Sequence, residues 1–254
     1  MTERILAERT GKVAVITVDA PGRRNSLTIP LSTELAAAIT DAEQDSGVHA
    51  VIVTGTPPAF CAGADLSALG EAQEEGLRKV YGGFLALARC KLPTIAAVGG
   101  AAVGAGLNLA LAADVRLAGP RAKFIPRFLE LGLHPGGGMT WMLQRAVGVQ
   151  RARAMTLFGQ SLDAAAAEHA GLTMRTVDGN HEELLQAALE LAAPAAEAPR
   201  DVVVSTKRSM RLTLALPEHE DAVQTEIRPQ LESLNSTEFE TRLQAMQAAI
   251  RSRK

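Results

Sequence analysis

The pattern of apolar positions along the first half of the chain predicts a set of short buried strands. Four runs are almost continuously apolar, as is typical of strands covered on both faces. They lie at residues 13–18, 50–54, 94–98 and 115–118. Between the first two runs, apolar side chains recur at spacings of three and four from Leu31 to Ala42, which predicts an amphipathic helix. Thr28 is a suitable cap for this helix, and Pro30 falls in its first turn.

The alternation of strands and helices favours an α/β fold with mainly parallel pairing, because parallel strands need crossover connections. After Val204 the strand patterns end, and residues 218–231 and 239–250 are predicted to be helices. Thr237 and Glu240 have the spacing of a capping box at the start of the final helix. The apolar residues of this region either fold back on the body of the protein or pack on another subunit. They are Leu231, Leu234, Phe239, Leu243 and Met246.

The composition excludes several classes of partner. The chain is 47% hydrophobic and 21% charged but only 3% aromatic, so its core must be built from small aliphatic side chains. A formal charge of −2, without basic or acidic blocks, gives no electrostatic basis for binding nucleic acid or a membrane surface.

Cys61 and Cys90 fit neither a usual metal site nor a disulfide framework. Residues 1–10 lack the apolar stretch of a secretory signal. We therefore expect a cytoplasmic protein with reduced cysteines and no metal.

Residues 92–113 carry no charged side chain and are long enough to cross a bilayer. However, Pro93 and four glycines interrupt the apolar pattern. A strand, a tight turn and a buried helix explain this stretch better than a membrane span.

Two glycine-containing segments, at residues 60–66 and 99–107, each follow a predicted strand. The second is not a phosphate-binding loop, because Ala105 stands where that motif needs lysine. It also lacks the dinucleotide fingerprint and its downstream acidic residue. What remains is a helix N-terminus in a turn of small residues, whose free N–H groups favour negative charge. Such a site suits a carbonyl oxygen that becomes an oxyanion.

The chain resembles the crotonase (enoyl-CoA hydratase/isomerase) superfamily over most of its length. The resemblance is carried by RNSL at 24–27, AVIVTG at 50–55, FCAGADL at 60–66, PTIAAV at 93–98, GAGL at 104–107, Asp114, Phe124, LGL at 131–133 and PGGG at 135–138. It implies a spiral core of repeated ββα turns over residues 1–200. It also implies a helical region at residues 201–254 that mediates assembly of a homotrimer or a dimer of trimers.

The same resemblance implies an acyl-CoA thioester as the ligand, with coenzyme A as part of the substrate and no separate cofactor. The backbone amides of Ala64 and Ala105 would form an oxyanion hole for the thioester carbonyl. The residues that the resemblance places around the substrate are Arg24, Ser26, Ala62, Asp65, Leu66, Val103, Asn108 and Phe128.

Two positions depart from the family pattern. Hydratases of the family carry glutamates where this chain has Asn108 and Phe128. Neither side chain exchanges a proton at neutral pH, whereas hydration needs a base for water and an acid for the α-carbon. The ordinary hydration mechanism is therefore not expected. Asn108 either hydrogen-bonds the substrate or a water, or satisfies a backbone group; Phe128 either narrows the acyl pocket or belongs to the core.

Glu130 and His134 are the candidate substitutes for these glutamates. Glu130 is two residues past the second glutamate position, and His134 falls near the position where the resemblance places an acidic group in related isomerases. A histidine serves as base or acid near pH 7 with little tuning. The alternatives are a surface carboxylate for Glu130 and a hydrogen-bonded turn residue for His134. Arg24 either contacts a coenzyme A phosphate or is a solvated loop residue, and Asp65 is either structural or part of the coenzyme pocket.

Two functions compete. The first is an enzyme, a lyase or isomerase, that acts on a coenzyme A thioester through a stabilised enolate. The second is an acyl-CoA carrier or sensor that keeps the scaffold without the proton-transfer groups.

Overall fold

The computed structural model describes residues 3–65 and 74–252. The chain divides into two compact units, the first ending at Ala196 and the second beginning at Glu197. Leu66, one of the predicted substrate contacts, lies outside the described residues.

The first unit is built on a six-stranded sheet with the strand order β1-β2-β3-β4-β6-β9. The strands are β1 (Arg4–Thr10), β2 (Val13–Asp19), β3 (Ala50–Gly55), β4 (Thr94–Val98), β6 (Val115–Ala118) and β9 (Arg175–Thr176). Only β1 pairs antiparallel, with β2, and the other neighbours are parallel. All four predicted strands are therefore confirmed, with ends within one residue.

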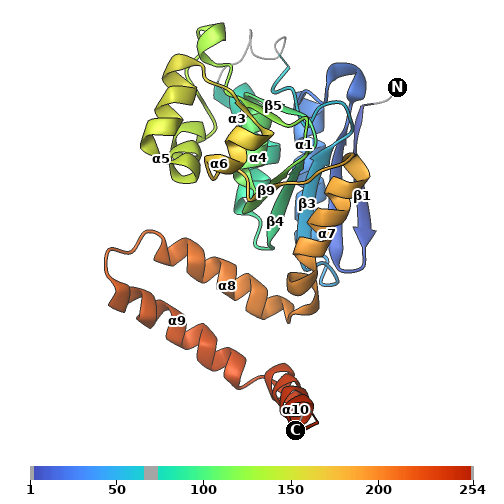
Figure 1. The fold of residues 1–254 in the computed structure, drawn as a ribbon, viewed down its shortest axis with the longest axis vertical. Helices are drawn as coiled ribbons and strands as arrows, with labels where there is room; N and C mark the ends of the chain where they lie inside the picture. Colours follow the sequence, from blue (N-terminus) through green and yellow to red (C-terminus); the bar gives the residue numbers. More distant parts are fainter. Residues whose placement is uncertain (1–2, 66–73, 253–254) are drawn as a thin grey trace. The chain divides into compact units, whose positions relative to one another are not determined.

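Helices connect the strands of this unit or follow them. They are α1 (Ile29–Gln44), α3 (Glu74–Arg89), α4 (Ala105–Ala112), α5 (Met139–Phe158), α6 (Ala164–His169) and α7 (His181–Glu197). In Figure 1, α7 lies in front of the strands, and its Leu184 and Ala188 are buried in one cluster with Ile52 of β3. The prediction for α1 is confirmed, because the Thr28 hydroxyl accepts a hydrogen bond from the Leu31 amide at 3.3 Å.

A second, three-stranded sheet leads directly to the site. It consists of β5 (Ala101–Val103), β7 (Lys123–Ile125) and β8 (Leu162–Asp163). Because β5 and β7 are parallel, with Val103 opposite Ile125, both strands end at the same edge. The Gly104 amide donates to the Ile125 carbonyl at 2.9 Å there. This pairing brings the start of α4 beside the segment that follows β7, which continues into the short helix η2 (Leu129–Leu131).

In the uncharged stretch at residues 92–113, the predicted strand is β4 and the predicted buried helix is α4. The short strand β5 between them was not predicted. All eight residues of α4 are buried, including Asn108, which accounts for the absence of charged side chains in this helix. Within the described part of the chain, no helix is both long and apolar enough to cross a membrane.

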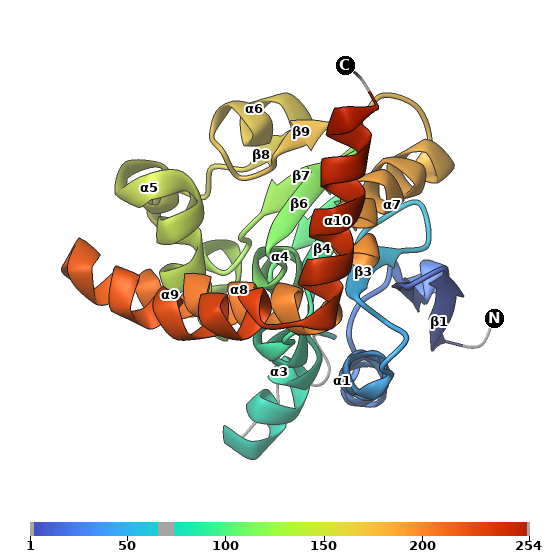
Figure 2. The same cartoon turned by 90° about the horizontal axis from the view of Figure 1, so that it is seen from below.

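The second unit consists of α8 (Arg200–Thr213), α9 (His219–Leu234) and α10 (Thr237–Arg251), and α8 and α9 form a helical hairpin (Figures 1 and 2). The predicted helices are confirmed, but the predicted capping box is wrong. Ser236 is the cap of α10, since its backbone is extended and its hydroxyl accepts from the Phe239 amide at 3.1 Å. Thr237 is already the first helical residue.

Candidate functional site

A cavity of about 620 Å³ in the first unit is lined by residues of both glycine-containing segments. The described residues that they contribute are Ala62, Gly63, Ala64, Val103, Gly104 and Ala105. The cavity is therefore the place where the two segments, some forty positions apart in the sequence, meet.

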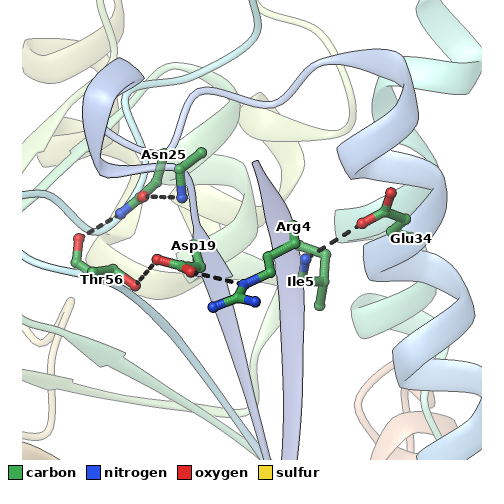
Figure 3. A network of polar contacts seen from close by, with 7 residues as sticks. Arg4, Ile5, Asp19, Asn25, Glu34 and Thr56 are labelled. Carbon is green, nitrogen blue, oxygen red and sulfur yellow. Dashed lines mark hydrogen bonds and ion pairs between the residues drawn. The ribbon is translucent and has the colours of Figure 1, made fainter. Parts of the chain in front are cut away.

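The first segment is held in place by Asn25, which is fully buried. Its Oδ1 accepts from the Ala20 amide at 3.0 Å, and its Nδ2 donates to the Thr56 carbonyl at 2.7 Å (Figure 3). The same Nδ2 donates to the Ala59 carbonyl at 2.8 Å. The Thr56 hydroxyl in turn donates to Asp19 at 2.9 Å. These bonds fix the chain that enters the segment. Sequence reasoning assigned no role to Asn25, although it lies in the RNSL motif.

The two segments approach each other so closely that glycine is required. Gly63 has φ +105°, and a Cβ there would lie 2.8 Å from the Val103 carbonyl oxygen and 3.7 Å from the Ala105 nitrogen. A Cβ on Gly106 would likewise collide with the carbonyl oxygen of Cys61. The Val103 amide donates to that Cys61 carbonyl at 2.9 Å, which links the segments directly.

The amides of Ala64 and Ala105 remain available for a ligand. The neighbours of Ala64 in the sequence are both hydrogen-bonded to Leu27. The Leu27 amide donates to the Gly63 carbonyl at 2.7 Å, and the Asp65 amide donates to the Leu27 carbonyl at 2.9 Å. Ala105 is the first residue of α4, so its N–H has no partner within the helix. Among the hydrogen bonds of the described residues, none is donated by either amide. The dipole of α4 adds a preference for negative charge at its start.

Asn108 and Phe128 both line the cavity. Asn108 is almost completely buried, and its Nδ2 donates to the Gly136 carbonyl at 2.9 Å. Its Oδ1 is also buried and has no partner among the described residues. Phe128 is half-buried, and its ring edge lies about 4.0 Å from where a Cβ on Gly104 would be. The aromatic ring thus lies beside the N-terminus of α4.

Glu130 and His134 also line the cavity, and both side chains are exposed. Glu130 pairs with the Nε of Arg127 at 3.4 Å. The Nδ1 of His134 lies 2.7 Å from the Pro135 carbonyl oxygen. Because a carbonyl only accepts hydrogen bonds, Nδ1 carries the proton of the neutral ring, and Nε2 keeps the lone pair that a base needs.

The predicted contacts Arg24, Ser26 and Asp65 are not among the residues that line the cavity. Arg24 is exposed, with φ +51°, and Ser26 is half-buried. Asp65 is buried and forms an ion pair with Arg23. Asp114 at the end of α4 accepts from the amide of Thr94 at 2.8 Å and from its hydroxyl at 3.0 Å, which ties α4 to the sheet.

Sequence reasoning missed Tyr81, which lines the cavity from α3. Its ring packs on Phe84, with the ring centroids 5.3 Å apart. Burial raises the pKa of the Tyr81 phenol. The only signal for this residue in the sequence is that it is the single tyrosine of the chain.

Comparisons with known proteins agree with this architecture. A sequence model described as enoyl-CoA hydratase/isomerase matches residues 8–251. A probable enoyl-CoA hydratase of Mycobacterium tuberculosis is 57% identical over 244 residues, which covers 92% of this chain and 94% of that protein. The solved enoyl-CoA hydratase of Bacillus anthracis is 27% identical, covers 96% of both chains and has a TM-score of 0.89.

A third relative was solved with a ligand. A putative enoyl-CoA hydratase of Thermobifida fusca, in complex with acetoacetyl-CoA, is 30% identical, covers 91% of this chain and 94% of its own, and has a TM-score of 0.82. Together these similarities confirm the resemblance drawn from the sequence motifs and the α/β fold that it implied.

Proposed function

Because the chain belongs to the enoyl-CoA hydratase/isomerase family, we propose that it binds an acyl-CoA thioester and stabilises the enolate of that thioester in the cavity. The observation that carries this proposal is that Ala64 and Ala105, whose amides have no partner among the described residues, line the same cavity. The acetoacetyl-CoA complex of the T. fusca relative supports the choice of ligand.

The two amides would act on the thioester oxygen. When a proton leaves the α-carbon, negative charge develops on that oxygen, and preorganised N–H donors stabilise it. Loss of one such donor typically raises a barrier by about 3 kcal/mol. This chemistry needs no cofactor beyond the coenzyme A that the substrate carries.

The proton must be moved by a group other than the usual glutamates, since Asn108 and Phe128 occupy their positions. Of the two candidates, Glu130 is paired with Arg127, whereas His134 keeps a free ring nitrogen in its neutral form. We assign the α-proton transfer to Nε2 of His134. The reaction is then an isomerisation or a related lyase step rather than classical hydration.

Exchange of α-protons with solvent tests this function without knowledge of the final product. Butyryl-CoA is incubated in D2O with the protein, and loss of the α-proton signal is followed by NMR. Wild-type protein is expected to accelerate the exchange, and His134→Gln to reduce it at least tenfold. His219→Gln, which changes another exposed histidine in the second unit, is the matched control and is expected to leave the rate unchanged.

A binding role without turnover is the second candidate. It is supported by Asn108, whose Nδ2 is engaged by the Gly136 carbonyl and so holds a turn rather than a substrate. Calorimetry that detects butyryl-CoA binding, together with an exchange rate equal to that of buffer, would favour this role. No binding of any acyl-CoA would eliminate both candidates.

We further propose that the second unit mediates assembly into a trimer or a dimer of trimers. Apolar side chains recur along α10 at helical spacing and remain exposed, at 38% to 64% of their surface. They are Phe239, Leu243, Met246 and Ile250. Light scattering is expected to give three or six times the mass of one chain, and Leu243→Glu to lower it. A monomeric wild-type protein would contradict the proposal.

A further inference from the structure

Part of the cavity wall carries polar groups that the proposed reaction does not use. Tyr81 reaches the cavity from α3 and Asn108 reaches it from α4. The Tyr81 hydroxyl lies so close to Gly136 that a Cβ on that glycine would overlap it. Asn108 holds the same glycine through the 2.9 Å bond to its carbonyl. The hydroxyl is therefore next to a turn whose position is fixed.

Neither the Tyr81 hydroxyl nor the Asn108 Oδ1, which is buried, has a hydrogen-bond partner among the residues that the structure describes. Arg127 and Glu130, which are charged and also line the cavity, are exposed and form an ion pair with each other, so they already have partners. The Tyr81 phenol is a hydrogen-bond donor at neutral pH, because a phenol has an ordinary pKa of about 10 and burial raises the pKa of this one further.

Filling the cavity changes the environment of this donor. An acyl chain displaces the water that would otherwise bind the hydroxyl, and a wholly apolar chain offers no replacement. A buried donor left without an acceptor is unfavourable, so sites of this kind reject ligands that lack the matching group. An oxygen on the acyl chain would restore the hydrogen bond.

We propose that Tyr81 is a specificity-determining residue whose hydroxyl donates a hydrogen bond to an oxygen on the acyl chain. The protein then prefers coenzyme A thioesters of hydroxylated acyl groups over saturated groups of the same length. This inference rests on the proposed function, because it requires the acyl group to occupy this cavity.

Calorimetric titration with butyryl-, 3-hydroxybutyryl- and 4-hydroxybutyryl-CoA tests the preference. Wild-type protein is expected to bind at least one hydroxylated thioester about tenfold more tightly than butyryl-CoA. Tyr81→Phe should abolish that difference, and it should tighten rather than weaken the binding of butyryl-CoA, because the buried donor without an acceptor is gone. The variant keeps the ring that packs on Phe84, so the fold of this wall is retained.

Gly136→Ala provides a second, independent variant, because its methyl group displaces the Tyr81 hydroxyl while the tyrosine remains. It should lose the preference too, and the double variant Tyr81→Phe/Gly136→Ala should lose no more than either single one. Equal weakening of all three ligands by Tyr81→Phe, or an unchanged preference, would overturn the inference. Wild-type protein that binds none of the ligands would overturn the proposed function and the inference with it.

Discussion

Replacing Gly63 with alanine is expected to separate the two amides without removing either of them. The added Cβ would lie 2.8 Å from the Val103 carbonyl oxygen, which is closer than such contacts occur in proteins. That oxygen belongs to the main chain and cannot rotate away. One of the two segments must therefore move by several tenths of an ångström, and the movement shifts Ala64 relative to Ala105.

The size of the effect follows from two contributions. A non-glycine residue held at a positive φ such as the +105° of Gly63 costs about 1–2 kcal/mol of stability. Misplacement of one oxyanion donor raises the barrier by about 3 kcal/mol, which slows the reaction about 100-fold. We expect a folded protein whose α-proton exchange with butyryl-CoA is about 100-fold slower than that of the wild type.

Gly11→Ala is the matched control. Gly11 has φ +58° in the turn between β1 and β2, and a Cβ there would meet no atom within 4 Å. This variant also places alanine at a positive φ but without the collision, so the exchange rate should stay near wild type. Unfolding followed by circular dichroism should show a smaller loss of stability than in Gly63→Ala. A folded Gly63→Ala protein with a wild-type exchange rate would refute the reasoning, and so would equal losses of rate in both variants.

Three further outcomes are expected. Burial raises the pKa of Cys61 to about 12, so about 1 in 10⁴ of its thiols is ionised at pH 8. Iodoacetamide should therefore alkylate Cys61 only when the protein is unfolded in urea, as measured by peptide mass spectrometry. Rapid alkylation of the native protein would contradict the burial of Cys61. Asn25→Ala removes the bonds to Ala20, Thr56 and Ala59 and should lower the free energy of unfolding in urea by about 2–4 kcal/mol; a change below about 0.5 kcal/mol would show that these bonds do not hold the segment. Asn108→Ala should destabilise by about 1–2 kcal/mol, since the Gly136 carbonyl loses its donor, and a stabilised variant would argue against that role.

The fold could be predicted where local pattern and tertiary burial agree. All six residues of β3 are buried, and the apolar run that they form in the sequence predicted a buried strand at this place. The helix α3 was not predicted, and its paired glycines show why. A Cβ on Gly83 would lie 2.8 Å from Leu35 and 3.1 Å from the Ser32 carbonyl of α1. This glycine permits two helices to pack closely, whereas in the sequence alone it indicates a break.

The site could be predicted from its glycine-containing segments and from the family resemblance, which also pointed to Asn108, Phe128, Glu130 and His134 in the cavity lining. The motifs of the two segments identified Ala64 and Ala105, and both residues do line one cavity. The contacts that support the segments join residues far apart in the sequence, and no local pattern reports them. Asn25 binds carbonyls 31 and 34 positions later, and Asn108 binds one 28 positions later. Tyr81 was missed for the same reason, because it enters the cavity from α3.

The most direct test is a crystal structure of the protein with acetoacetyl-CoA bound. The thioester oxygen is expected within about 2.7–3.1 Å of the backbone nitrogens of both Ala64 and Ala105. A thioester oxygen bound by only one of these amides, or by side chains elsewhere on the protein, would contradict the account.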